Sequence, residues 1–281
     1  MIREISVIAV AVAVCELCLQ ANHFLSPDMR NALARAAEQE TSPLASRILG
    51  QLEENLQIAA EESIPICQDT GMAVVFLKIG QDEHFFDGDM TEDENDGVRR
   101  GYTEGFLRKS VVGDPLLRQN TGDNTPAILH CSIVPGNQVE ITVAPKGFGS
   151  ENMSRIFMLK PADGTEGVKE AIVQTVAEAG PNACPPLVVG VGIGGTFEKA
   201  ALLAKEALTR ETGAPSELPH VCALEAELLE RINALQIGPA GLGGNATALA
   251  VHINTYATHI AGLPLAVNLC CHVNRHASRV L

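Results

Sequence analysis

The feature that most constrains the fold is a change in hydrophobic pattern near residue 65. Before it, apolar residues recur at helical spacing, as at Leu44, Ile48 and Leu52 behind the Ser42-Pro43 helix start. After it come short β-prone runs separated by glycine, proline and asparagine clusters. These runs cover residues 72–79, 127–134 and 139–144. The pattern predicts a helical N-terminal region up to about residue 64, followed by a central sheet up to about residue 160.

Helices and strands alternate in the remaining part of the chain. The predicted segments are a helix over 165–179, a buried strand over 187–193, helices over 197–208 and 221–235, and a last apolar segment over 263–269. With no internal repeat and no convincing linker, the chain is predicted to form one mixed α/β (α+β) domain over residues 1–281. Two packed lobes divided near residue 160 are the alternative.

An acidic stretch, Asp82 to Asp96, interrupts the sheet region. It is predicted to be a solvated loop that caps a helix running from Val98 to Leu107.

Charge and hydropathy exclude several classes of function. With 20 basic and 34 acidic residues among 281, the formal charge is −14, which disfavours nucleic-acid binding. The apolar run Ile5–Val14 is too short to span a membrane, and Glu4 disrupts the positively charged segment that precedes the apolar part of a signal peptide. The eight cysteines lie mostly far apart in a chain too large to need disulfides, which favours a reducing cytoplasm.

The most specific local motif is Cys67-Gln68-Asp69-Thr70-Gly71, which follows Pro65. A loop of this kind can direct a thiol, an amide and a carboxylate to one place. The structural alternatives are a buried thiol and an Asp that stabilises a turn.

Cys184 and the pair Cys270-Cys271 also stand next to turns, at the ends of predicted strands. Three separated thiolates would suit an iron–sulfur cluster, and a [4Fe-4S] cube held by three of them keeps one iron open as a Lewis acid. Zinc is the rival metal, but structural zinc sites use close CxxC pairs. Four other cysteines are predicted to be packing thiols: Cys15, Cys18, Cys131 and Cys222.

The glycines Gly190, Gly192 and Gly195 satisfy the GxGxxG dinucleotide fingerprint. Because no second parallel strand and no ribose-binding acidic residue are predicted after the helix, close strand–helix packing is the favoured interpretation.

Two further loops let the backbone approach a ligand closely: Asn120 to Pro126, and Lys146-Gly147-Phe148-Gly149-Ser150. Neither is a Walker motif. Four nearby cations could neutralise a dianionic substrate, although solvated surface is their alternative role: Arg108, Lys109, Arg118 and Lys146.

Taken together, these motifs resemble those of the iron–sulfur-dependent class I fumarate hydratases, specifically the alpha subunit of the two-subunit form, with tartrate dehydratase alpha as a close relative. The resemblance runs through the segments that begin at Cys67, Asn120, Lys146 and Ala183 and ends at Cys271. It implies a hydro-lyase of the tricarboxylic acid cycle that interconverts fumarate and malate.

The resemblance also implies roles for individual residues. Cys67, Cys184 and Cys271 would ligate the [4Fe-4S] cluster, with Cys271 preferred to Cys270 because it lies four residues before Arg275. Asp69 and His259 would be catalytic. Substrate-binding groups for the C4 dicarboxylate would be Gln68, Arg108 and Gly149.

The chain ends soon after Cys271, where the long single-chain members continue into a second domain. The resemblance therefore implies a separate beta subunit and an α2β2 heterotetramer in the cytoplasm, without a membrane or nucleic-acid partner. Two alternatives are an L-tartrate dehydratase alpha subunit and a non-enzymatic iron- or redox-sensing subunit. A proton-transfer group such as Asp69 beside Arg108 favours the enzyme over the sensor.

Overall fold

The computed structural model describes residues 2–281. It divides into two compact units, each built from segments that are not contiguous in the sequence. Unit 1 comprises Met1–Ser26, Leu56–Gly147 and Arg275–Leu281, and unit 2 comprises Pro27–Asn55 and Phe148–Asn274. One boundary between these units falls between Gly147 and Phe148. That the whole chain works as one catalytic domain stays a prediction.

The N-terminal region is helical, as predicted. Its helices are α1 (Val7–His23), α2 (Pro27–Gln39) and α3 (Pro43–Glu62). The apolar stretch extends beyond Val14, and Val7–Gln39 is apolar and long enough to qualify as a membrane span by length and composition alone. However, 56% of its most apolar window is buried inside the protein, as in the core helix of a soluble protein. The chain also leaves the helical conformation between α1 and α2.

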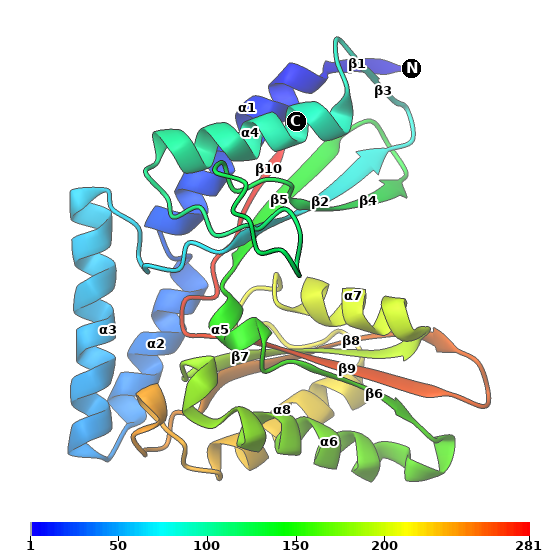
Figure 1. Cartoon of the computed structure of the whole chain (residues 1–281). Helices are drawn as coiled ribbons and strands as arrows, with labels where there is room; N and C mark the ends of the chain where they lie inside the picture. Colours follow the sequence, from blue (N-terminus) through cyan, green and yellow to red (C-terminus); the bar gives the residue numbers. More distant parts are fainter. Residues whose placement is uncertain (1) are drawn as a thin grey trace. The chain divides into compact units, whose positions relative to one another are not determined.

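Unit 1 is built on a four-stranded sheet with the order β10-β5-β2-β4. Its strands are β2 (Met72–Gly80), β4 (Ile128–Val134), β5 (Val139–Lys146) and β10 (Ala277–Val280). A two-stranded parallel sheet pairs β1 (Arg3–Ser6) with β3 (Glu83–Phe86). The aliphatic side chains of β2 and β5 that face α1 form the core of this unit, because the strands alternate their side chains between the two faces. Figure 1 shows α1 and α4 (Met90–Glu104) together on this side.

The acidic stretch is mostly regular structure, so the prediction of a solvated loop is wrong. Residues 83–86 form β3, and α4 begins at Met90, eight residues earlier than expected. Asp89 starts this helix as its N-cap, because its Oδ1 accepts the N–H groups of Thr91 at 2.9 Å and Glu92 at 3.0 Å. Glu94 is 1% exposed and belongs to the interior of unit 1.

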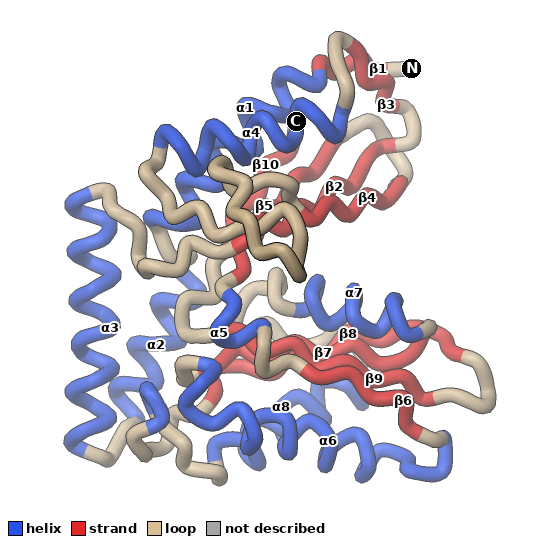
Figure 2. Tube along the Cα trace, viewed as in Figure 1, coloured by secondary structure: helices blue, strands red, loops and turns tan. Residues whose placement is uncertain are grey.

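Unit 2 is built on a second four-stranded sheet with the order β6-β9-β7-β8. Its strands are β6 (Arg155–Leu159), β7 (Leu187–Gly195), β8 (Ala248–Thr258) and β9 (Leu263–Cys270). Its longer helices are α6 (Gly164–Ala179), α7 (Phe197–Ala207) and α8 (Pro219–Asn233), and α5 (Phe148–Glu151) is a single turn. Within this unit α7 covers one face of the sheet while α6 and α8 cover the other, so the sheet is a buried middle layer (Figures 1 and 2).

The expectation that no parallel strand follows α7 is wrong, since β8 pairs with β7 in parallel. The favoured interpretation of the glycine fingerprint nevertheless fits the structure. A Cβ at Gly190 would overlap the backbone of α7 at Ala204, and one at Gly192 would overlap it at Ala200. These glycines therefore let α7 pack directly on β7. The helices and mixed sheets of the two units confirm the predicted mixed α/β fold class.

Candidate active site

The Cys67–Gly71 loop joins α3 to β2 in unit 1. Asp69 Oδ1 accepts the N–H of Gly71 at 3.0 Å, which closes a tight turn of the kind that Asp favours. Gly71 has φ +77°, and a Cβ there would lie 2.7 to 2.8 Å from the backbone atoms of Lys146. Only glycine fits this position, and the turn therefore rests on the end of β5.

This contact brings two of the sequence motifs together within unit 1. A Cβ at Gly147 would lie 3.1 Å from Asp69 Oδ2, so the Asp69 carboxylate occupies the space above that glycine. Cys67 Sγ accepts the Asp69 N–H at 3.4 Å and lies 3.4 Å from Gln68 Oε1. The thiol, the amide and the carboxylate are held by one turn, as the motif predicts.

Buried polar groups hold this turn from behind. The Tyr102 hydroxyl lies 2.8 Å from Thr70 O, to which it donates, and 3.0 Å from Gly71 O. Asn124 Nδ2 donates to Gly71 O at 3.1 Å. Burial raises the pKa of Tyr102, which keeps its hydroxyl neutral and able to donate. Side chains from the interior of unit 1 therefore hold the backbone of this turn in place.

Arg108 is positioned next to this loop through its backbone. Thr70 Oγ1 donates to Arg108 O at 3.0 Å. The Arg108 residue is exposed, and its guanidinium makes no hydrogen bond or ion pair within residues 2–281. Such a group is available to bind a carboxylate in a bidentate manner.

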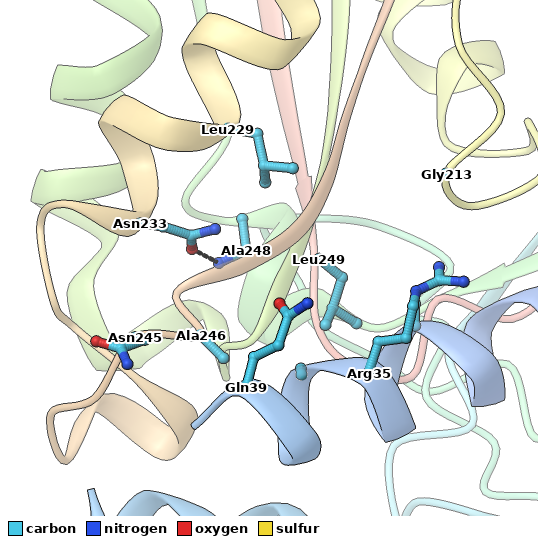
Figure 3. Close-up of a pocket in the computed structure, with 11 residues that line it drawn as sticks. Arg35, Gln39, Gly213, Leu229, Asn233, Asn245, Ala246, Ala248 and Leu249 are labelled. Atoms are coloured by element: carbon cyan, nitrogen blue, oxygen red, sulfur yellow. Dashed lines mark hydrogen bonds between the residues drawn. The ribbon is translucent and has the colours of Figure 1, made fainter. Parts of the chain in front are cut away.

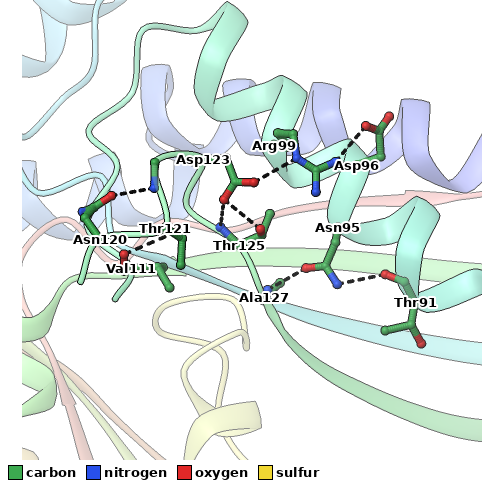
Figure 4. A network of polar contacts seen from close by, with 11 residues as sticks. Thr91, Asn95, Asp96, Arg99, Val111, Asn120, Thr121, Asp123, Thr125 and Ala127 are labelled. Carbon is green, nitrogen blue, oxygen red and sulfur yellow. Dashed lines mark hydrogen bonds and ion pairs between the residues drawn. The ribbon is translucent and has the colours of Figure 1, made fainter. Parts of the chain in front are cut away.

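The Asn120–Pro126 motif has a structural role in unit 1 (Figure 4). Asp123 Oδ2 accepts Arg99 Nε of α4 at 2.9 Å, and its Oδ1 accepts the Thr125 N–H at 3.0 Å. Although burial opposes ionisation, the hydrogen bonds from Thr125 and Arg99 lower the pKa of Asp123 to about 2. This carboxylate is therefore ionised at neutral pH, and it anchors the loop to α4.

In unit 2, Cys184 and Cys271 lie at the same end of the sheet. Cys184 precedes β7 and Cys271 follows β9, and these strands are antiparallel with Val188 opposite Cys270. The His272 N–H donates to Cys184 O at 3.4 Å, and His272 Nδ1 lies 3.1 Å from the same oxygen. The two cysteine segments are therefore bonded to each other by their backbones.

The exposure of the cysteines in unit 2 differs in a way that bears on ligation. Cys184 is exposed and Cys271 is half-buried, whereas Cys270 is the last residue of β9 and only 4% exposed. This difference supports Cys271 over Cys270, which stays a prediction.

Gly149 lies beside the Cys184 loop. A Cβ at Gly149 would meet Asn182 O at an ordinary contact distance of 3.6 Å. At the end of α5, Glu151 Oε2 accepts Asn268 Nδ2 of β9 at 2.8 Å. Thus α5 is tied to the strand that leads to Cys271.

The predicted cluster ligands belong to different units, Cys67 to unit 1 and the other two to unit 2. Among residues 2–281, neither unit by itself brings together three His, Cys, Asp or Glu side chains that could hold a metal ion. Each unit supplies part of the predicted ligand set.

Comparison with known proteins supplies the identity that these motifs indicate. The family model for fumarate hydratase (Fumerase) matches residues 11–280. A Methanocaldococcus jannaschii protein provisionally named L(+)-tartrate dehydratase subunit alpha is 43% identical over 270 residues, which cover 94% of each chain. The L(+)-tartrate dehydratase subunit alpha of Escherichia coli strain K12 is 32% identical over 254 residues, or 89% of this chain and 84% of the relative. This chain belongs to the fumarate hydratase family. It is therefore a hydro-lyase, which favours the enzyme over the sensing subunit.

The predicted histidine of this fumarate hydratase family member is not near Cys271 within unit 2. His259 is exposed in the turn between β8 and β9, where its Nδ1 accepts the Ala261 N–H at 3.2 Å. Cys271 follows the opposite end of the eight-residue β9. An eight-residue strand is about 26 Å long. The catalytic role of His259 stays a prediction that unit 2 alone does not support.

One residue of the candidate site was missed by the sequence analysis. Arg275 is 4% exposed and donates from Nη2 to Asp69 O, so it holds the backbone of the candidate acid–base residue. The sequence did offer a signal, because Arg275 lies four residues after Cys271. The sequence analysis used this arginine only to prefer Cys271 to Cys270 as a cluster ligand.

Proposed function

We propose that the chain is the alpha subunit of a [4Fe-4S]-dependent hydro-lyase that interconverts fumarate and malate by reversible hydration. The observation that carries the proposal is the Cys67–Gly71 turn, where a thiol and a carboxylate are held side by side by buried groups. Membership of the fumarate hydratase family supports the reaction type.

The donor set fits an iron–sulfur cluster. Cys67, Cys184 and Cys271 would hold it, because thiolates are the ligands that such clusters use and all three residues are at least partly accessible. When bound, a cube with three protein ligands supplies one iron that acts as a Lewis acid toward substrate oxygens.

Residues of this chain would handle the proton and the charge of the substrate. Hydration places OH on one carbon of the double bond and a proton on its neighbour, and Asp69 is the proposed group that transfers a proton. Arg108 would neutralise a substrate carboxylate, on which negative charge grows as the C–H bond forms or breaks. Gln68 and the backbone of Gly149 would orient the dicarboxylate.

A second subunit would complete the enzyme. The relatives are named subunit alpha, and this chain matches the M. jannaschii relative over 94% of that relative's length. We therefore place the chain in an α2β2 complex with a beta subunit, in the cytoplasm and in the tricarboxylic acid cycle. Without the beta subunit, turnover should be close to background.

The first test measures iron and acid-labile sulfide after anaerobic purification. Wild type should contain about four of each per chain, as a cubane requires. Cys67→Ser, Cys184→Ser and Cys271→Ser should each lose them, while Cys131→Ser, which changes another exposed cysteine, should keep them. Zinc in place of iron, or full iron retention in all three variants, would overturn the ligand assignment.

L(+)-tartrate is the second candidate substrate, because the relatives described above are named tartrate dehydratases. Malate and L(+)-tartrate differ by one hydroxyl group, and a pocket can discriminate between them through a few polar contacts. The complex with its beta subunit should be assayed with malate and L(+)-tartrate. A higher kcat/KM for malate supports the fumarate hydratase proposal, and a higher value for tartrate replaces it.

A further inference from the structure

Unit 2 contains a pocket that none of the proposed catalytic residues lines. It has a volume of about 320 Å³ and lies between α2, α8, the loop at Gly213 and the start of β8 (Figure 3). The apolar part of its wall is formed by Ala32, Ala36, Leu229, Ala246, Ala248 and Leu249. The polar part is formed by Arg35, Gln39, Asn233 and Asn245. Small-molecule sites combine apolar surface with a few polar groups, and the wall of this pocket has both.

The pocket is preformed because α2 is fixed at both ends. At its start, Asp28 Oδ2 accepts the Thr212 N–H at 2.6 Å. Just beyond its other end, Glu40 Oε2 accepts the Asn245 N–H at 2.8 Å. Although burial opposes ionisation, backbone N–H donors lower the pKa of Glu40, so its charge is already engaged. Between these two anchors α2 presents Ala32 and Ala36, which are too small to fill the space against β8.

The strand beside the pocket has a free edge. Among the described residues, β8 is at the end of its sheet and pairs with β7 alone. The Ala248 N–H is satisfied by Asn233 Oδ1 at 2.9 Å, as Figure 3 shows. Since this oxygen also accepts the Thr247 N–H at 3.0 Å, the amide orientation is fixed and Nδ2 is left as a donor.

Arg35 is the one charged side chain among the described residues that line the pocket. Its guanidinium forms no hydrogen bond or ion pair within residues 2–281. It lies over Gly213, where a Cβ would come within 3.4 Å of Arg35 Nη2. No carboxylate of the lining competes for this cation, although the whole chain has a net charge of −14.

From this combination we propose that the pocket binds a small organic monoanion, with its carboxylate on Arg35 and its apolar body against Ala32, Ala36 and Leu249. A cavity of about 150 Å³ lined by apolar groups accommodates benzene. The volume here is about twice as large, which suits a body of two fused rings or a branched aliphatic chain of similar size. The site is separate from the proposed C4 dicarboxylate site, where two charges must be neutralised.

The test is isothermal titration of the full chain with three probes. We expect 2-naphthoate to bind with a stoichiometry of one. The neutral 2-naphthylmethanol should bind at least tenfold more weakly because it lacks the charge, and inorganic phosphate should give no measurable binding because it lacks the apolar body. Saturating fumarate should leave the naphthoate titration unchanged. Equal affinity for phosphate and naphthoate, or competition by fumarate, would overturn the proposal.

Two variants and a matched control locate the binding. Arg35→Gln should weaken naphthoate binding at least tenfold, and Ala36→Leu should abolish it by filling the cavity while the melting temperature is retained. Arg30→Gln removes an exposed arginine of the same helix that does not line the pocket, and should bind naphthoate like wild type. Unchanged binding in both pocket variants would show that naphthoate binds elsewhere and would refute the assignment.

Discussion

The Asp69 carboxylate lies directly above Gly147, so close that a Cβ at residue 147 would come within 3.1 Å of Asp69 Oδ2. The two residues are 78 positions apart in the sequence. They meet because Met72 pairs with Lys146 across β2 and β5. The sheet of unit 1 therefore determines where the candidate proton-transfer group points.

Replacing Asp69 by Asn tests its catalytic role. The amide keeps an oxygen that can accept the Gly71 N–H, so the turn should survive. We expect kcat to fall by roughly 10²- to 10⁴-fold, the usual contribution of a positioned acid or base. The iron and sulfide content should not change. Retained turnover in the complex with the beta subunit would sink the assignment.

Gly147→Ala tests whether the position of the Asp69 carboxylate matters. The added methyl group presses on Oδ2 and must displace it by a few tenths of an ångström. Because a misplacement of 1 Å can cost about 100-fold, we expect a loss of about tenfold in kcat with little change in stability. Gly113→Ala is the matched control, because its new Cβ would have no neighbour closer than 3.7 Å. Equal activity of both variants would mean that the contact is irrelevant.

Glu94 predicts an unusual pH dependence for unit 1. Neither carboxyl oxygen has a hydrogen-bond partner among the described residues, and burial raises the pKa of Glu94 from 4.5 to about 7. Since the folded state holds this proton more tightly, the stabilisation is complete below pH 4.5 and is lost as the pH rises through 7. The free energy of unfolding should fall by about 3 kcal/mol at most.

Glu94→Gln should remove this dependence. Chemical denaturation of the two proteins at pH 5 and pH 8 measures the effect, with hydrogen exchange on α4 to assign it to unit 1. The variant should gain stability over wild type as the pH rises between these values. A constant difference between variant and wild type would contradict the titration of Glu94.

His252 predicts the opposite dependence for unit 2. The residue is 1% exposed, its Nδ1 donates to Ala207 O at 3.1 Å, and burial together with the charge of Arg210 lowers the pKa of His252 to about 4. The folded state therefore favours the neutral ring, and stability is lost as the pH falls from 6.5 toward 4. The free energy of unfolding should again fall by about 3 kcal/mol at most.

Denaturation of His252→Gln between pH 4 and pH 7 tests this second dependence. The variant should be less stable than wild type at pH 7, where a buried ring is lost, but the difference should shrink toward pH 4. An unchanged difference across this range would show that His252 does not titrate in it.

Local patterns in the sequence were sufficient to predict where most of the longer helices and strands lie. β2, β4, β7 and β9 begin within one residue of the predicted positions, because short apolar, β-prone runs bounded by turn residues depend only on sequence neighbours. β8 was missed, since Asn254 and the exposed residues after it break the apolar pattern at a sheet edge. The prediction of a solvated loop fails most clearly at Glu94 of α4. This residue is buried by tertiary packing that its sequence neighbours do not reveal.

The sequence by itself determined the motifs of the candidate site, because the Cys67–Gly71 turn and the glycine positions follow from local backbone chemistry. Only the tertiary structure decided which motifs become neighbours. In the folded chain the Asp69 carboxylate lies close to Gly147, and the His272 N–H donates to the backbone oxygen of Cys184. His259 lies at the opposite end of β9 from Cys271. The physical reason is that strand pairing and burial bring together residues far apart in the chain, and no local pattern encodes which strand a given strand will pair with.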